Sequence, residues 1–194
     1  MQFFFEGKLS YCEYVKDLKI DNVHRYYHDN EYGFPMYSDN ELFGRLILEI
    51  FQAGLNWTII LNKKKNFENA FDGFNIEKVA NYGDEDFERL VNDKGIIRNK
   101  LKINAAIYNA NEILKIQNTN GSFINWLKSN NSLTLNEWVK LFKKQFKFTG
   151  PEITNEFLMS TGTIRGAHTQ ECKIYNEILQ LNPLWAEKES NKYY

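Results

Sequence analysis

Both cysteines of the chain and two of its three histidines are candidates for a metal site. His168 and Cys172 are four positions apart, and on one helical turn this spacing would place an imidazole beside a thiolate. Cys12 and His28 could complete a Cys2His2 tetrahedron, a ligand set without an open position that is typical of a structural Zn²⁺ ion. The alternative is that the cysteines fill apolar space and the histidines lie at the surface. Spacing alone leaves both interpretations open.

A second group of candidates lies in the segment 91–100 and just after it. This segment combines the end of a short helix, a turn containing a glycine and two β-branched residues, and basic side chains at the start of another helix. In such a helix-hairpin-helix unit, N–H groups at the start of the second helix and nearby cations would hold DNA phosphates without reading base sequence. The candidate DNA-binding residues are Gly95, Arg98, Lys100 and Lys102. An ordinary helical turn with solvated lysines fits the same pattern.

The third group combines aromatic rings with a carboxylate. Glu49 interrupts the most apolar helical segment of the chain, and a carboxylate there is costly to bury unless something binds it. Together with Tyr27, Tyr32 and Trp57 it could form a pocket for a flat cationic ring, held by stacking and cation–π attraction. The alternative is that Glu49 caps a backbone group or pairs with an arginine while the rings fill the core.

The elements that must position these residues are expected to be helices. Apolar residues recur mostly with helical spacing, and clean alternation with period two is scarce, so we expect an all-α protein. The segment 38–57 is expected to hold the central helix, with Ser38 and Glu41 as a capping box; Thr134 and Glu137 form a second such signature. Further helices are expected over 63–71, 76–81, 84–92, 98–117, 121–129, 134–146, 152–161 and 170–180.

Length and composition limit the classes of protein to consider. The chain has 194 residues, a formal net charge of −1 and 43% hydrophobic positions, which is typical of a globular protein with one substantial core. We expect one domain over 1–185 and a polar tail over 186–194. No run is long and apolar enough for a membrane span, and the first residues lack the features of a signal peptide, so we expect a cytoplasmic protein with reduced thiols.

Taken in order, several motifs resemble those of one known family. They are YHDNEYG (27–33), LEIFQAGLNW (48–57), GIIRNKLKI (95–103), FKFTG (146–150) and the His-x3-Cys pair (168–172). From about residue 12 to about residue 180 the chain resembles the 3-methyladenine DNA glycosylase I family. The resemblance implies a helix-hairpin-helix DNA glycosylase fold with a zinc clip that joins the N-terminal and C-terminal regions.

The resemblance also implies roles for individual residues. It assigns one structural zinc ion to Cys12, His28, His168 and Cys172. It places Glu49 in the base pocket as the catalytic residue, and it assigns the stacking of the flipped base to Tyr14, Tyr27, Tyr32 and Trp57. Where the family commonly has tryptophan the chain has Tyr14 and Tyr32, and where the family hairpin has glycine it has Leu101.

The implied activity is excision of 3-methyladenine from alkylated double-stranded DNA by a monomeric enzyme, which releases the free base and leaves an abasic site. Methylation at N3 makes the base a cationic leaving group, so cleavage needs little acid catalysis. The enzyme would flip the nucleotide out of the duplex and hold it against the aromatic rings. The alternatives are a zinc-stabilised DNA-binding module with weakened catalysis, a glycosylase for another alkylated base, or a binder of free purines.

Overall fold

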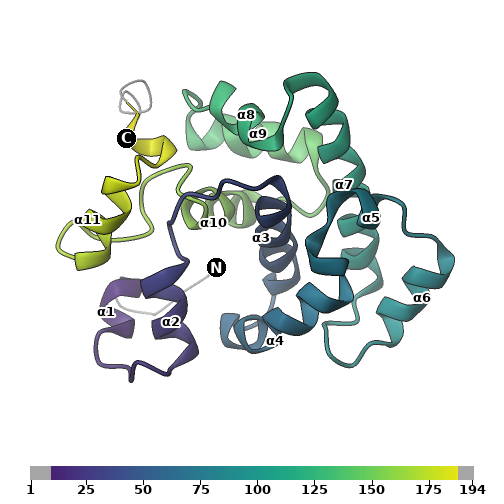
Figure 1. Ribbon diagram of the computed structural model, residues 1–194, viewed down its shortest axis with the longest axis horizontal. Helices are drawn as coiled ribbons and strands as arrows, with labels where there is room; N and C mark the ends of the chain where they lie inside the picture. The colour runs from purple at the N-terminus through teal and green to yellow at the C-terminus, as the bar shows by residue number, and fades with distance from the viewer. Residues whose placement is uncertain (1–9, 188–194) are drawn as a thin grey trace.

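The computed structural model describes residues 10–187, and this part of the chain contains helices and no strands. The prediction of an all-α fold is therefore confirmed (Figure 1). The α-helices are α1 (Tyr11–Val15), α2 (Val23–Asn30), α3 (Asp39–Gln52), α4 (Trp57–Ala70), α5 (Ile76–Ala80), α6 (Asp84–Asn92), α7 (Lys100–Asn120), α8 (Phe123–Ser129), α9 (Leu135–Gln145), α10 (Pro151–Ser160) and α11 (Lys173–Gln180). Two 3-10 turns, Asp72–Phe74 and Leu184–Ala186, complete the described elements.

Helix α3 is the centre of the molecule because it is buried on every side along most of its length. Every residue from 42 to 52 is buried, including two charged ones. In Figure 1, α1, α2 and α11 lie on one side of α3, and α5, α6 and α7 lie on the other. The aromatic and aliphatic side chains of α3 therefore form the core that joins these two groups of helices.

The start of α3 differs from the expected capping box. Ser38 is the N-cap, but its side chain makes no capping hydrogen bond. Asp39 instead accepts hydrogen bonds from the backbone N–H groups of Phe123 and Ile124, at 2.8 and 3.1 Å, and so caps the first turn of α8. The capping box of Thr134 and Glu137 is confirmed at the start of α9.

The end of α3 also differs from the prediction, because the helix stops at Gln52 and α4 begins separately at Trp57. The ammonium group of Lys102 donates hydrogen bonds to the carbonyl oxygens of Phe51 and Ala53, at 3.1 and 2.6 Å. These bonds satisfy carbonyl groups that a helix end leaves without helical partners. The chain therefore turns between the two helices, so that Glu49 lies on α3 and Trp57 lies on α4.

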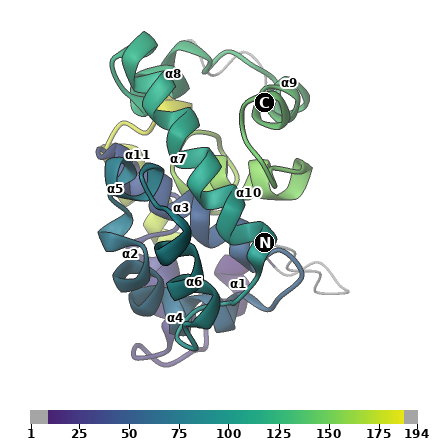
Figure 2. The same ribbon diagram turned by 90° about the vertical axis from the view of Figure 1, so that its right-hand side faces the viewer.

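Helices α6 and α7 form the predicted helix-hairpin-helix unit, with residues 93–99 as the connection. Helix α7 has 21 residues and in Figure 2 runs from α8 past α6. Asn99 caps α7 by accepting hydrogen bonds from two backbone N–H groups of its first turn. The buried Ile96 anchors the hairpin in the core.

Two glycines allow the backbone of the segment after α10 to pass in direct contact with the backbone of the segment after α2. Gly33 has φ +81°, and its N–H donates to the carbonyl oxygen of Ser160 at 3.0 Å. Gly162 has φ +65°, and a Cβ atom there would lie 2.8 Å from the carbonyl oxygen of Gly33. This close crossing places Tyr32 next to the end of α10.

Both ends of the described chain contain elements that the sequence pattern did not predict. The short helices α1 and α2 were not predicted, and they supply half of the candidate metal ligands. Trp185 packs with Ile174 and Ile178 in a small separate cluster. Residues 188–194 of the predicted tail lie outside the described residues. No helix between residues 10 and 187 combines the length and apolar character needed to cross a bilayer.

Candidate functional site

The two cysteines and two histidines that were singled out as metal ligands come together in space. One ligand atom from each of Cys12, His28, His168 and Cys172 lies within 4.8 Å of the others. Cys12 Sγ is 3.6 Å from His168 Nδ1, and Cys172 Sγ is 3.7 Å from both His28 Nε2 and His168 Nδ1. The group is able to bind one metal ion, and both histidines are buried.

The outer nitrogen of each histidine is held by an oxygen atom. His28 Nδ1 lies 2.7 Å from Asp29 Oδ1, and His168 Nε2 lies 2.6 Å from the carbonyl oxygen of Tyr32. An N–H at each outer nitrogen leaves the inner nitrogen with a lone pair that faces the cysteines. Metal-binding histidines typically have such partners.

The elements that carry these ligands come from both ends of the chain. Cys12 is on α1, His28 is on α2, and Cys172 is the N-cap of α11. The helix expected over 170–180 begins only at Lys173, so His168 and Cys172 lie before α11 and not on one of its turns. The turn before it, closed by a hydrogen bond from the Cys172 N–H to the Thr169 carbonyl, still brings imidazole and thiol together.

Three of the four predicted base-binding rings form one buried group. The Tyr27 ring lies 5.6 Å from the Tyr32 ring and 5.4 Å from the Trp57 ring, measured between centroids. All three side chains are buried. Tyr27 and Tyr32 come from α2 and the turn that follows it, whereas Trp57 is the first residue of α4.

Tyr14, the fourth predicted ring, lies outside this buried group and reaches it through Tyr11. Its ring stacks on Tyr11 at 6.0 Å with an interplanar angle of 15°, and Tyr11 in turn meets Tyr32 edge-on at 5.4 Å. The hydroxyl of Tyr11 is 3.0 Å from His24 Nδ1, and His24 Nε2 is 2.8 Å from the Thr58 hydroxyl. Sequence reasoning missed Tyr11 and His24, whose spacing offers no clear signal. Their contacts fix α1 against α2 and α4.

Glu49 is 1% exposed, and its carboxyl group belongs to the same buried region. Burial raises its pKa, while the positive charge of Arg45 and a hydrogen bond with Ser160 act in the opposite direction. Among the described residues, Glu49 Oε2 and the indole N–H of Trp57 are buried without a hydrogen-bond partner. Buried polar atoms are rarely left unpaired. A polar, flat ligand among these rings would be able to satisfy both the unpaired acceptor and the unpaired donor.

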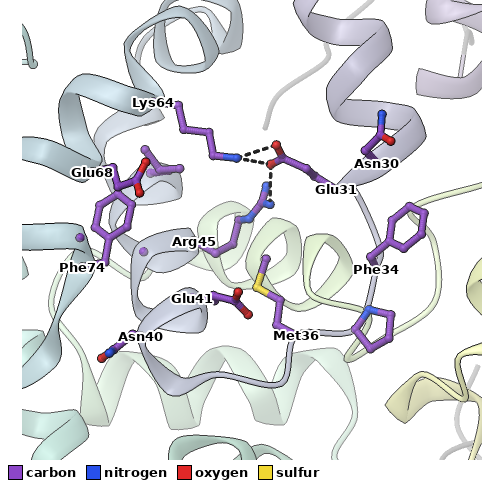
Figure 3. Close-up of a pocket in the computed structure, with 14 residues that line it drawn as sticks. Asn30, Glu31, Phe34, Met36, Asn40, Glu41, Arg45, Lys64, Glu68 and Phe74 are labelled. Carbon is purple, nitrogen blue, oxygen red and sulfur yellow. Dashed lines mark hydrogen bonds and ion pairs between the residues drawn. The ribbon is translucent and has the colours of Figure 1, made fainter.

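Arg45 lies on α3, one helical turn before Glu49, and packs against the same group of buried rings. Its guanidinium lies over the Tyr27 ring at 4.9 Å and donates a hydrogen bond to the Tyr27 hydroxyl. It also pairs with Glu31 at 3.3 Å, and Glu31 binds Lys64 (Figure 3). Sequence reasoning missed Arg45, although it is a charged residue in the same apolar segment that drew attention to Glu49. The ion pair expected as an alternative for Glu49 is thus made by Glu31.

The hairpin presents fewer cations than its sequence suggests. Arg98 and Lys100 are exposed, whereas Lys102 is 6% exposed and its ammonium is bound at the end of α3. The assignment of Lys102 to DNA phosphate is therefore wrong, because the side chain turns into the core. The Gly95 N–H donates to Asp93 Oδ1 at 2.7 Å, and its carbonyl accepts from Lys63 at 2.8 Å. Gly95 therefore shapes the turn.

Among the cavities that the described residues line near this group, two bear on the site. One of about 420 Å³ is lined by Glu31, Arg45 and Lys64 on the side of Arg45 shown in Figure 3, and it includes none of the predicted base-binding rings. The other, about 240 Å³, is lined by Tyr11, Tyr32, His168 and Glu156, among others. We take the smaller cavity as part of the candidate site, because Tyr32 connects it to the buried ring group.

Comparison with known proteins gives consistent matches. The model of the family described as "Methyladenine glycosylase" matches residues 17–140. DNA-3-methyladenine glycosylase 1 of Escherichia coli (strain K12) is 35% identical over 174 residues, which span 80% of this chain and 92% of the relative.

Solved structures give the same result. The structure that describes 3-methyladenine recognition by 3-methyladenine DNA glycosylase I from Staphylococcus aureus has a TM-score of 0.73 and 33% identity, covering 80% of this chain and 93% of that chain. A tyrosine-to-phenylalanine variant of a 3-methyladenine DNA glycosylase I in complex with 3-methyladenine has a TM-score of 0.74 and 32% identity, covering 80% and 94%.

Proposed function

Because the chain belongs to the methyladenine glycosylase family, we propose that it excises 3-methyladenine from alkylated DNA by hydrolysing the bond between base and deoxyribose. The observation that carries this proposal is the buried Glu49 carboxyl, with one oxygen that has no partner among the described residues, beside the buried rings of Tyr27, Tyr32 and Trp57. A flat cation satisfies such a pocket through stacking, cation–π attraction and a charge-assisted hydrogen bond.

The chemistry makes modest demands on the protein. Methylation at N3 places a positive charge on adenine, so the C1′–N9 bond breaks with its electron pair moving to a base that leaves as neutral 3-methyladenine. Water supplies the hydroxyl group at C1′ and releases one proton. The leaving group needs no protonation, and a strong general acid is unnecessary.

The residues of the pocket would recognise the base after it has left the duplex. Tyr27 and Trp57 offer ring faces and edges, and Glu49 Oε2 offers an acceptor for the exocyclic amine. Charge attraction also stabilises the bound substrate, so acceleration requires contacts that become stronger as the base departs. The bonds from Arg45 to Tyr27 and Glu31 hold the pocket rigid, which favours such contacts.

Contacts with the duplex are assigned to the hairpin. Arg98 and Lys100 are exposed at the start of α7, where the helix dipole also favours phosphate. These contacts hold the DNA without reading its sequence, as a lesion-specific enzyme requires.

We propose that the Cys2His2 group binds one structural zinc ion. Zn–S bonds of about 2.3 Å and Zn–N bonds of about 2.0 Å give S···N edges of about 3.5 Å in a tetrahedron. The three observed sulfur–nitrogen distances, 3.6, 3.7 and 3.7 Å, fit this geometry. Four protein ligands leave no position for water, so the ion would hold α1, α2 and α11 together.

The test is release of free base from methylated duplex DNA, with chromatography that separates 3-methyladenine from 7-methylguanine. The wild-type protein is expected to release 3-methyladenine selectively, and Glu49→Gln is expected to lose at least about 100-fold in rate, the scale typical of a key charged contact. Equal rates for the folded mutant and the wild type would refute the role of Glu49. Duplex binding by the wild type without base release would favour a DNA-binding module.

A further inference from the structure

An arginine outside the Cys2His2 group links two of the segments that carry its ligands. Arg25 lies on α2, and its Nε atom donates a hydrogen bond to Asp29 Oδ2 at 2.6 Å. The other carboxylate oxygen, Asp29 Oδ1, lies 2.7 Å from His28 Nδ1. The two oxygens of Asp29 thus face Arg25 and His28. The orientation of the His28 ring therefore depends on a carboxylate that Arg25 holds.

The same guanidinium also binds the end of α1. Its Nη1 atom donates hydrogen bonds to the carbonyl oxygens of Val15 and Lys16, both at 3.1 Å. Val15 is the last residue of α1, and Lys16 is its C-cap. Helix α1 has five residues and carries Cys12. A helix this short needs contacts from outside to hold its position, and Arg25 supplies such contacts at the end of α1.

These contacts differ from those of an ordinary surface ion pair. Arg25 and Asp29 are four positions apart on one helix, a spacing at which exposed pairs contribute little to stability. Their side chains, however, are only 22% and 19% exposed. In the ion pair of Lys65 and Glu68 on α4, the corresponding values are 74% and 41%. Arg25 also uses a second nitrogen atom to bind carbonyl groups outside α2, so its contacts join two helices.

We propose that Arg25 is a positioning residue of the Cys2His2 group, which holds the His28 ring and the Cys12 thiol in the arrangement that a metal ion requires. It acts on His28 through Asp29 and on Cys12 through the end of α1. This inference rests on the zinc site proposed above and extends it to a residue that is not itself a ligand. The planar guanidinium suits this role, since its N–H groups point in fixed directions toward carboxylate and carbonyl oxygens at once.

The experiment measures the zinc affinity of the full chain by competition with a chromogenic chelator. Arg25→Gln is expected to raise the dissociation constant for Zn²⁺ about 10-fold, a loss typical of residues that support metal ligands. Arg25→Lys keeps the positive charge but cannot bind Asp29 and the α1 carbonyl groups together, so it should weaken zinc binding to a similar extent. Co²⁺ in place of zinc reports ligand geometry through its visible absorption bands, and these bands should change in both variants.

A matched arginine serves as the control for a general loss of stability. Arg89 also donates a hydrogen bond to a carbonyl oxygen, that of Ala70, and pairs with Asp86 of its own helix. It lies on α6, which is across α3 from α1, α2 and α11 (Figure 1). Arg89→Gln is therefore expected to leave zinc affinity unchanged.

A double variant tests whether Arg25 acts through Asp29. Asp29→Ala removes the carboxylate that holds His28 and is expected to weaken zinc binding by itself. Once this carboxylate is absent, Arg25 has lost one of its two routes to the ligands. The loss of affinity in Arg25→Gln combined with Asp29→Ala should therefore be smaller than the product of the two single losses.

Each outcome supports or contradicts the inference. Unchanged zinc affinity or an unchanged Co²⁺ spectrum in Arg25→Gln would overturn it, and so would losses that simply multiply in the double variant. An equal loss of affinity in Arg89→Gln would also overturn it, because destabilisation alone would then account for both results. A wild type that binds no zinc would overturn both the inference and the proposed metal site. A wild type that binds zinc, with unchanged affinity in Arg25→Gln, would refute only the role of Arg25.

Discussion

At the scale of the residue, Glu49 shows how the burial of a carboxyl group lowers stability. The carboxyl is buried among Tyr27, Tyr32 and Arg45, and one of its oxygens has no partner among the described residues. Glu156 adds a second carboxyl nearby. The folded protein without ligand thus holds acidic groups in an environment that disfavours their charged forms.

Replacement of Glu49 by glutamine is expected to stabilise the free protein at neutral pH. Because the pKa of Glu49 is raised above 4.5 in the folded state, the unfolded chain releases this proton at lower pH than the folded protein does. The stability of the wild type therefore falls, relative to Glu49→Gln, as pH rises above 4.5. Each kcal/mol gained should raise Tm by about 2–4 °C.

Thermal unfolding between pH 4 and pH 8 checks this expectation. The difference in Tm between Glu49→Gln and the wild type should be small at pH 4 and should grow toward neutral pH. Glu41→Gln, at the exposed start of the same helix, serves as the control and should give no such increase. A mutant that is less stable than the wild type at pH 8 would contradict the argument.

At the scale of the element, the hairpin divides its cations between two tasks. Arg98 and Lys100 remain exposed, whereas Lys102 caps the end of α3 and Lys63 binds the hairpin carbonyls from α4. In the sequence, the residues that stay exposed and the one that turns inward belong to the same run of basic residues. Only the direction of each side chain decides whether it meets DNA or the core.

Arg98→Ala and Lys102→Met should therefore have different effects. Arg98→Ala is expected to reduce the slope of log Kd against log salt concentration by about 1, because one phosphate contact is lost. Lys102→Met should leave this slope unchanged and destabilise the fold by about 1–3 kcal/mol, since the carbonyls of Phe51 and Ala53 lose their donor. Fluorescence anisotropy with duplex DNA and urea unfolding measure the two effects. A reduced salt slope in Lys102→Met would show that the Lys102 side chain does contact a phosphate.

At the scale of the whole molecule, the Cys2His2 group connects segments that are far apart in the chain. Cys12 and His28 come from the first helices, and His168 and Cys172 precede the last one. The carbonyl oxygen of Tyr32 binds His168 and so links the Cys2His2 group to the buried aromatic rings. Loss of an ion at this position should loosen both ends of the chain and the Tyr32 side of the pocket.

Cys172→Ser is expected to lose bound zinc and to lower Tm on the order of 10 °C, because the ion stabilises only the folded arrangement. Elemental analysis gives the zinc content, and hydrogen exchange should show faster exchange in α1, α2 and α11 than in α7. His24→Gln changes the histidine that lies outside the group and should keep its zinc. Equal zinc content in Cys172→Ser and the wild type would refute the metal site.

The sequence by itself determined the helical class and the hairpin between residues 92 and 100, because these depend on local periodicity, and its few cysteines and histidines gave the candidates for the group that could bind a metal. It also identified Glu49, since a carboxylate in an apolar helix is conspicuous without any knowledge of its neighbours. The tertiary structure decided which side chains face the pocket. Lys102 turns inward because the end of α3 offers it two carbonyl oxygens, and Tyr32 reaches Glu156 on α10 because Gly33 and Gly162 let distant segments cross closely. Such contacts depend on residues far apart in the chain, so no local pattern records them.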